Sequence, residues 1–358
     1  MTIGGQNFLV IVDTGSSDTF LAKKGFSCFD LSDNPVPESE CAFGTAGFDT
    51  AKSKTFQPFP NMNFNISFAD EEFLTGEVGF ETITVGGLTV PHQEFSLATK
   101  AAWDGDGVTS GLMGLAYPGL TSVFTGTDPD ADSGANSVPY NPFFFTAVQQ
   151  KLVAAPFFSV ALNRGSFAAA ANSTFDPNLG FLAFGGIAPV SVTKTAVTVP
   201  VQGFTVSSGA TELFFYNVDV DSYVFPGSTR IKTSGAAILD TGTTLNFVPT
   251  NVALAYNAQF DPPAQLDEEE DLFFVDCNAK APPFSAVIGG KSFAVDGRDN
   301  IIPSLDSDGT LVCISGVQDG GPNEDGNIFV LGDVFLHNVV ATFDITNNTI
   351  TLHERTKY

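Results

Sequence analysis

Basic side chains are scarce in this chain of 358 residues. Lys and Arg together number 15 against 40 Asp and Glu, which gives a net charge of −25. Nucleic acid is excluded as a default partner, because phosphate binding needs cationic side chains, and docking on anionic lipid is disfavoured for the same reason. Much of this charge is titrated away near pH 4. The composition therefore fits a protein suited to an acidic medium, or simply an acidic soluble protein.

Long hydrophobic runs and several hydrolase motifs are also missing. No apolar stretch approaches the ~18 residues of a membrane span, and the last six residues form no hydrophobic tail for a lipid anchor. No G-x-S-x-G nucleophile elbow occurs. The only histidines are His92, His337 and His353, and they do not form H-E-x-x-H. Serine and zinc hydrolysis are therefore disfavoured.

Cysteines are few and none forms a C-x-x-C pair, which argues against a zinc ribbon. The four stand at Cys28, Cys41, Cys277 and Cys313. Two separated pairs suggest two local disulfides, Cys28–Cys41 and Cys277–Cys313, although three connectivities are possible. Disulfides and N-x-S/T sequons favour an oxidising, secretory setting; the sequons are at Asn65, Asn172 and Asn347.

The hydrophobic pattern predicts a mostly β protein. Alternating, β-branched or aromatic runs recur, as at Phe8–Val12, Glu81–Val85 and Phe214–Val220, and most end in turn residues. The 35 Gly and 21 Pro are typical of many short strands. We expect helices only at 142–153 and 249–260.

A polar segment, 125–142, looks like an inserted loop that could be mistaken for a metal site. Its Asp128, Asp130 and Asp132 resemble the start of a calcium loop. Ser133 and Pro139 stand where such a loop needs Gly and Glu. We therefore expect no bound metal here.

An internal repeat divides the chain into two related halves. Residues 11–22 read I-V-D-T-G-S-S-D-T-F-L-A, and residues 238–249 read I-L-D-T-G-T-T-L-N-F-V-P. Each copy is followed by two apolar residues and a glycine: Leu112-Met113-Gly114 ends 101 residues after Asp13, and Val330-Leu331-Gly332 ends 92 after Asp240. We predict two lobes, 1–188 and 189–358, each with its own core.

Each repeat places an Asp on a tight turn that follows an apolar strand. Gly15 and Gly242 permit the turn and close backbone approach. Asp13 and Asp240 could then meet on a pseudo-twofold axis. Two carboxyls in contact share one proton, so one can act as a general base on water while the other donates to a substrate carbonyl.

On these motifs the sequence resembles the pepsin-type (A1) aspartic endopeptidases of fungi, through essentially the whole chain. The stretches G-L-M-G-L-A-Y-P (111–118) and L-G-D-V-F-L (331–336) are close to signatures of that family. The resemblance implies a bilobal β fold, with Asp13 and Asp240 as the catalytic pair. It also implies supporting roles for the rest of both loops: Thr14 and Thr241 cross-link them, Ser16 and Thr243 hydrogen-bond the outer carboxylate oxygens, and Gly15 and Gly242 make the turns.

The hairpin at 64–88 resembles the flap that covers bound peptide, with its tip at 68–72. Phe68 and Ala69 stand where the family has Tyr and Gly, and Phe20 stands where it commonly has the Trp that receives the tyrosine hydroxyl. We expect a Phe–Phe contact in place of that hydrogen bond. Asp70 matches a position that favours a basic side chain at the cleaved bond in some members, although a solvated acid is an equal alternative.

The resemblance extends to the partners and setting of the protein. It implies an extended peptide or protein substrate in the cleft between the lobes, inhibition by statine-type compounds, no cofactor or metal, a monomeric state, and secretion or a vacuolar location. Both proposed disulfides fall where the family has them. Only twelve residues precede Asp13, so we expect the family's first strand to be missing. The alternative function is a catalytically silent homologue that binds peptide or protein.

Overall fold

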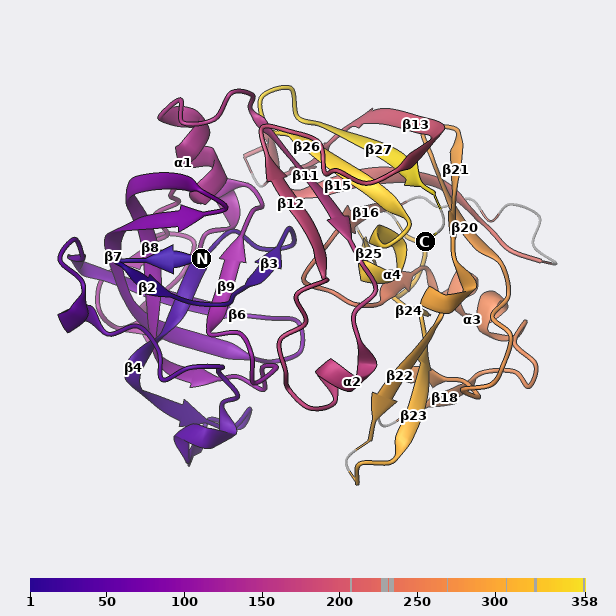
Figure 1. Ribbon diagram of the computed structural model, residues 1–358, viewed down its shortest axis with the longest axis horizontal. Helices are drawn as coiled ribbons and strands as arrows, with labels where there is room; N and C mark the ends of the chain where they lie inside the picture. Colours follow the sequence, from indigo (N-terminus) through magenta and orange to yellow (C-terminus); the bar gives the residue numbers. More distant parts are fainter. Residues whose placement is uncertain are drawn as a thin grey trace. The chain divides into compact units, whose positions relative to one another are not determined.

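Strands dominate the computed structural model (Figure 1), as the sequence predicts. It describes residues 1–206, 208–226, 231, 235–268, 270–306, 308–324, 327–356 and 358. The chain divides into two compact units. The first holds residues 1–154 and 173–175, and the second holds 155–172 and 176–358. The lobe boundary after residue 188 stays a prediction.

The first unit is built on one ten-stranded sheet in the order β10-β6-β7-β8-β4-β9-β3, with β1 paired to both β7 and β2, and β5 paired to β4. Its long central strands are β6 (Gln57–Ser67), β7 (Phe73–Val85) and β8 (Leu88–Ala102). The remaining elements are β1 (Thr2–Ile3), β2 (Gln6–Asn7), β3 (Ile11–Asp13), β4 (Thr19–Phe29), β5 (Pro35–Val36), β9 (Gly111–Gly114), β10 (Val123–Thr125) and α1 (Phe143–Gln149), with short 3-10 turns at Glu38–Glu40, Thr50–Lys52, Pro118–Leu120 and Pro129–Ala131.

Three sheets make up the described part of the second unit. A five-stranded sheet has β12 (Gly180–Phe184), β11 (Phe157–Leu162), β26 (Val339–Asp344), β27 (Thr349–Arg355) and β13 (Val192–Pro200) in that order. An eight-stranded sheet has β21 (Lys291–Val295), β20 (Phe284–Ile288), β15 (Thr211–Val224), β16 (Ala236–Leu239), β25 (Ile328–Leu331), β17 (Asn246–Val248) and β24 (Val317–Asp319), with β14 (Gln202–Thr205) on β15. A four-stranded sheet has β18 (Gln265–Asp267), β19 (Leu272–Phe274), β23 (Leu311–Ser315) and β22 (Ile301–Leu305).

Helices are short, and the two that the sequence predicts are present. α1 lies within 142–153, and α3 (Thr250–Asn257) lies within 249–260. Two further single turns, α2 (Phe167–Ala170) and α4 (Asp333–Leu336), and a 3-10 turn at Gly297–Asp299 complete the second unit's described helices. The predicted strand at 8–12 begins only at Ile11, because the preceding residues close a small hairpin in which the Phe8 amide donates to the Met1 carbonyl.

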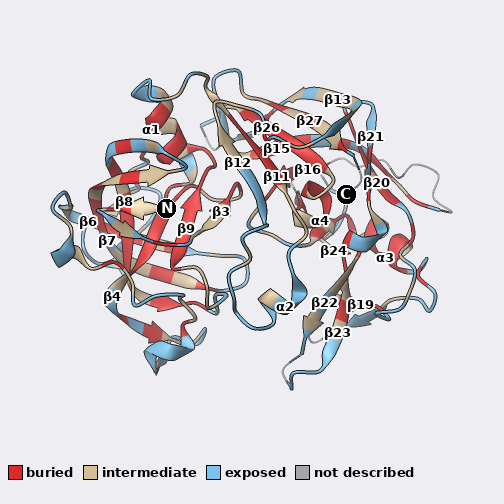
Figure 2. Cartoon of the chain, viewed as in Figure 1, coloured by how far each residue is buried: buried red, intermediate tan, exposed pale blue. Residues whose placement is uncertain are grey.

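The core of the first unit lies between its long strands, whose interiors are buried (Figure 2). Phe20, Phe64 and Leu112 belong to one apolar cluster, and so does the disulfide between Cys28 and Cys41. The second disulfide, Cys277–Cys313, ties the segment after β19 to β23. Both predicted disulfides are thus confirmed.

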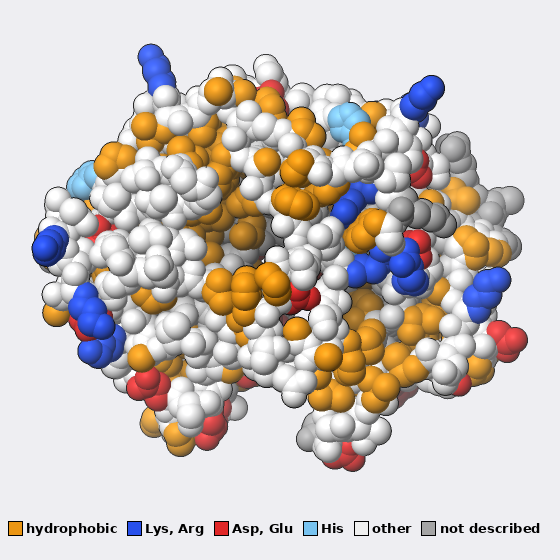
Figure 3. All heavy atoms as spheres, in the orientation of Figure 1, with side chains coloured by type: hydrophobic (Ala, Val, Ile, Leu, Met, Phe, Trp, Pro, Cys, Tyr) orange, Lys and Arg blue, Asp and Glu red, His pale blue; other side chains and the backbone are white. Residues whose placement is uncertain are grey.

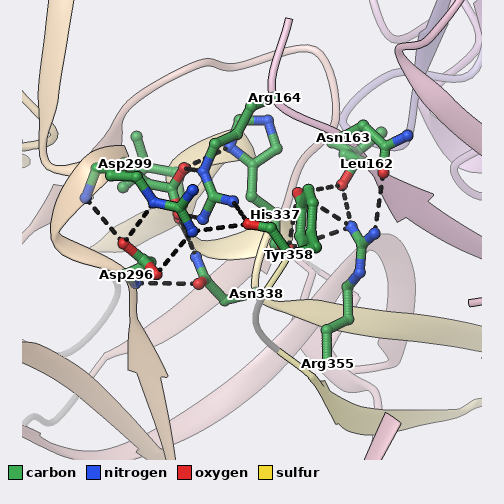
Figure 4. Close-up of polar contacts among 11 residues, drawn as sticks. Leu162, Asn163, Arg164, Asp296, Asp299, His337, Asn338, Arg355 and Tyr358 are labelled. Atoms are coloured by element: carbon green, nitrogen blue, oxygen red, sulfur yellow. Dashed lines mark hydrogen bonds and ion pairs between the residues drawn. The ribbon is translucent and has the colours of Figure 1, made fainter. Parts of the chain in front are cut away.

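An ion-pair network holds the C-terminal part of the second unit together (Figure 4). Arg164 binds Asp299 through two hydrogen bonds of 2.6 and 2.7 Å, and the Asn338 amide donates to the same carboxyl at 2.9 Å. Asp299 is only 4% exposed. Burial opposes its ionisation, but the contacts with His337, Arg164 and Asn338 outweigh burial and lower the pKa of Asp299.

Tyr358 joins this network through both its ring and its backbone. Its ring lies between the guanidinium groups of Arg164 and Arg355, whose central carbons are 4.6 and 4.0 Å from the ring centroid. Its carbonyl accepts a hydrogen bond from Arg298 at 2.8 Å. Three of the four arginines in the chain therefore gather here, and Figure 3 shows basic side chains grouped near the C-terminus.

Candidate active site

Asp13 ends a short edge strand, β3, that pairs with β9, the strand of the predicted apolar-apolar-Gly motif. β3 runs parallel to β9, with Asp13 opposite Gly114, and β9 runs antiparallel to β4, with Met113 opposite Thr19. The chain therefore leaves β3, turns through the D-T-G-S-S loop and returns on the far side of β9. The loop is fixed at both ends by backbone pairing to the same strand.

Asp240 occupies the equivalent place in the second unit. The strand before it, β16, runs parallel to β25, with Leu239 opposite Leu331, and β17 runs antiparallel to β25, with Asn246 opposite Leu331. The amide of Asp240 itself donates to the Leu331 carbonyl. The two copies of the sequence repeat therefore form the same arrangement of strands around an Asp.

The two carboxyls are held by the same kinds of donor. In the first loop, the Gly15 amide donates to Oδ1 of Asp13 at 2.7 Å, and the Ser16 hydroxyl donates to its Oδ2. In the second, the Gly242 amide donates to Oδ1 of Asp240 at 2.8 Å, and the hydroxyl of Thr243 donates to Oδ2 at 2.7 Å. Asp13 is 5% exposed and Asp240 is 8% exposed. Both side chains are therefore oriented by their own loops and largely shielded.

Glycine is required beside each loop because the backbone approaches too closely for a side chain. A Cβ on Gly114 would lie 2.4 Å from the Ser17 carbonyl carbon, and one on Gly332 would lie 2.2 Å from the backbone carbonyl oxygen of Thr243. These contacts explain why the apolar-apolar-Gly pattern accompanies both D-T-G copies. The pattern marks the strand that supports the loop.

A buried acid that the sequence analysis did not single out lies behind the first loop. Asp18 is fully buried and accepts hydrogen bonds from the Tyr140 hydroxyl and the Ser122 amide, both at 2.9 Å. Burial raises its pKa to about 7, and the two hydrogen bonds oppose that rise. Burial likewise raises the pKa of Glu94 to about 7, with the charge of Asp18 adding to the effect. The only sequence signal of Asp18 is its position directly before the buried residues that begin β4.

The hairpin tip between β6 and β7 carries the predicted flap residues. Ala69 and Asp70 are exposed, whereas Phe68 is half-buried. The Phe68 ring centroid lies 6.4 Å from that of Phe20 and 5.8 Å from that of Trp103. The predicted Phe–Phe contact is present, and the chain's single Trp joins it, which the sequence alone did not indicate.

Several predictions about the site concern both units at once. Asp13 and Asp240 belong to different units, and so do Thr14 and Thr241. The approach of the two carboxyls and the cross-link between the loops therefore stay predictions.

Among the described residues, no group of three or more His, Cys, Asp or Glu side chains could hold a metal ion. Asp132, from the D-x-D-x-D segment, instead accepts hydrogen bonds from the side-chain amides of Asn63, Asn65 and Asn136. These amides tie the segment to β6 and to its own turn.

Comparison with known proteins agrees with this topology. The sequence pattern of the family described as eukaryotic aspartyl protease matches residues 1–355. A probable aspartic-type endopeptidase of Aspergillus fumigatus is 40% identical over 351 residues, covering 96% of this chain and 75% of that protein. An aspartic protease of Coccidioides posadasii is 29% identical over 96% of this chain and 69% of its own length.

A solved structure shows the same fold. The crystal structure of an aspartic proteinase from Irpex lacteus superposes with a TM-score of 0.73 at 21% identity, covering 99% of this chain and 93% of that one. The chain belongs to the eukaryotic aspartyl protease family. Its fold is the mostly β, bilobal fold of pepsin-like enzymes. Across the described residues, no helix is long and apolar enough to cross a membrane.

Proposed function

We propose that this protein is an aspartic endopeptidase that hydrolyses peptide bonds of extended polypeptides at acidic pH. One observation carries the proposal. Two Asp side chains, on loops of the same topology, are each held by a glycine amide on one oxygen and a hydroxyl on the other. A single Asp on a turn is ordinarily explained as an Asx-turn, and that explanation does not account for two loops with the same hydrogen bonds.

The proposed reaction uses the two carboxyls of Asp13 and Asp240 as one proton-sharing pair. The ionised member accepts a proton from water while the neutral member donates one to the substrate carbonyl, and the water oxygen forms the new bond to carbon. In the second step the C–N bond of this adduct breaks: the newly protonated carboxyl gives its proton to the leaving nitrogen, and the ionised carboxyl takes one from an adduct hydroxyl, which restores the pair. The hydroxyls of Ser16 and Thr243 keep the outer oxygens in place, so the inner ones face the reacting atoms. The reaction needs no covalent intermediate and no cofactor.

The substrate is an extended peptide or protein segment lying in the cleft between the two lobes. Its backbone pairs with the exposed hairpin tip at Ala69 and Asp70, in the manner of a strand added to a sheet edge. The aromatic side chains at the hairpin tip, Phe68, Phe20 and Trp103, favour hydrophobic side chains next to the cleaved bond. The specificity is broad, because apolar pockets discriminate by only ~1–3 kcal/mol.

Cleavage of a denatured protein at about pH 4 tests the proposal. We expect internal cleavage that a statine-type inhibitor blocks, because that inhibitor mimics the tetrahedral adduct formed at a carboxyl pair. Binding of the inhibitor without any cleavage would instead favour the catalytically silent homologue. Cleavage that the inhibitor leaves unchanged would contradict the assignment of a carboxyl pair.

Asp70 is the proposed determinant of a modest tolerance for Lys at the residue before the cleaved bond. We expect Asp70→Ala to lower the ratio of kcat/KM for a Lys peptide over a matched Phe peptide by up to about fivefold, since an exposed ion pair contributes about 0–1 kcal/mol. The exposed Asp33 provides a matched control, Asp33→Ala, which should leave the ratio unchanged. An unchanged ratio in Asp70→Ala would show that Asp70 is only a solvated acid.

The proposed setting is extracellular or vacuolar, with the protein acting as a monomer. Two disulfides support an oxidising environment. Of the sequons, Asn172 and Asn347 are exposed, whereas the half-buried Asn65 donates its side-chain amide to Pro129 and Asp132. We therefore propose glycans at the two exposed sites and none at Asn65.

A further inference from the structure

Directly below the flap tip, a buried glutamate joins the hairpin to a distant part of the first unit. Glu72 is 9% exposed, and its Oε1 accepts the amide of Asp104 at 2.6 Å. The backbone of Gly105 also acts on this carboxyl and opposes the rise in its pKa that burial causes. Segment 103–105 follows β8, so this carboxyl links residues more than thirty positions apart along the chain.

The tip itself is a tight turn whose residues are hydrogen-bonded to one another, so the position of Glu72 determines that of its neighbours. The Phe68 amide donates to the Glu72 carbonyl at 2.9 Å, and the Glu71 amide donates to the Phe68 carbonyl. Glu71 has a φ of 71°, in the left-handed region that non-glycine residues seldom adopt. The Glu72 amide donates back to Asp70. Fixing Glu72 therefore fixes the whole tip.

An apolar contact lies beside the polar one. Trp103, directly before Asp104, is 5% exposed and contacts both Phe68 and Phe20 through its ring. Its indole N–H finds no hydrogen-bond acceptor among the described residues. The hairpin tip is thus fastened at two points, by an aromatic contact at Phe68 and by a carboxyl at Glu72.

We propose that Glu72 is a positioning residue for the hairpin tip, and that its carboxyl fastens the tip in acid and releases it when it ionises. The fastened tip holds Phe68 against Trp103 and Phe20 and presents Ala69 and Asp70 to substrate. The effect on catalysis rests on the proposed function. The fastening itself is a property of the first unit alone.

The surroundings of Glu72 explain the dependence on pH. Burial raises the pKa of this carboxyl to about 7; the Asp104 amide opposes the rise, and the like charges of Asp70 and Asp104 add to it. The nearest strand also carries Lys100, but that ammonium is paired with Asp33 at 2.6 Å. Above neutral pH, Glu72 becomes a buried anion beside two other acids, which disfavours the fastened position.

Trp103 gives a readout that does not depend on activity, because it is the only Trp in the chain. In the wild type we expect its emission to change with a midpoint near pH 7. Glu72→Gln keeps a neutral acceptor, so its emission should match the wild type in acid and lose this midpoint. Glu72→Ala should show, already at about pH 4, the emission that the wild type reaches only above neutral pH.

Peptide kinetics give the second readout. At about pH 4, Glu72→Ala should raise KM about tenfold with kcat changed less than about twofold, because the tip positions substrate and carries no reacting group. Glu72→Gln should restore KM. Glu77→Gln, an exposed position on β7 paired with Lys23, is the matched control and should behave as wild type. Asp18→Asn, which removes another buried acid, should keep the midpoint near pH 7.

Wild-type emission and KM in Glu72→Ala would overturn the fastening. A midpoint near pH 7 that persists in Glu72→Gln would overturn its pH dependence. If the emission results hold while the wild type cleaves no peptide, the fastening stands and the proposed endopeptidase function fails.

Discussion

Replacing either Asp13 or Asp240 by Asn is expected to lower kcat/KM for peptide cleavage at about pH 4 by about 10²–10⁴-fold, the range for loss of a positioned acid or base. Asn keeps the size of the side chain: its oxygen can accept from the glycine amide, and its NH2 group can donate to the hydroxyl oxygen of Ser16 or Thr243. It cannot take part in sharing a proton. The fold should therefore survive, with unchanged circular dichroism, while activity is lost.

The control for this pair is Asp33→Asn. Asp33 is an exposed acid paired with Lys100, and its φ of 63° is a conformation that Asn also tolerates. We expect it to retain wild-type activity. A folded Asp13→Asn or Asp240→Asn protein with wild-type kcat/KM would show that the chemistry lies elsewhere.

Stability is expected to fall as the pH rises from about 4 to 7, and Asp18→Asn should flatten this dependence. Burial raises the pKa of Asp18 to about 7 in the folded protein, whereas the unfolded chain titrates it near 4. Between these values the folded state holds a proton that the unfolded state has lost. Raising the pH therefore favours unfolding, by up to a few kcal/mol for this one group. Above pH 7 the penalty is complete.

Thermal melts at about pH 4 and pH 7 measure this effect. The wild type should melt at least about 5 °C lower at pH 7, and Asp18→Asn should narrow the difference. Its amide can still accept from Ser122 and donate to the Tyr140 oxygen. Glu94→Gln should narrow the difference further, because burial also raises the pKa of Glu94. An Asp18→Asn protein with the full wild-type difference between the two pH values would contradict this origin.

The candidate site was visible in the sequence because its chemistry is local. Two loops of the form D-T-G-[ST] carry their own hydrogen-bond donors two and three residues after the acid, and the structure shows those contacts within each loop. The supporting glycines, Gly114 and Gly332, were recognisable because close backbone approach leaves no other choice. Both disulfides followed from two cysteine pairs well separated along the chain.

The residues that sequence reasoning passed over act through long-range contacts. Asp18 meets Tyr140, which lies 122 positions away, and no local pattern records such a pairing. The sequence alone gives Trp103 no role, and only its contact with Phe68 relates it to the hairpin tip. Glu72 sits in a run of three acids, where a solvated turn is the ordinary interpretation. Its burial depends on segment 103–105, which contacts the hairpin only in the folded protein.

The arginine network around Asp299 makes the stability of the second unit depend on pH in the opposite direction to that of the first. Its lowered pKa makes Asp299 stabilising above about pH 4, and this contribution is lost as stronger acid protonates the carboxyl. Asp18 acts in the reverse sense within the first unit. A rise in pH toward 7 therefore destabilises the first unit, and strong acid destabilises the second. Stability is therefore limited at both ends of the pH scale, and an unrelated protease added at about pH 7 should cut the first unit first and spare fragments that begin near residue 155.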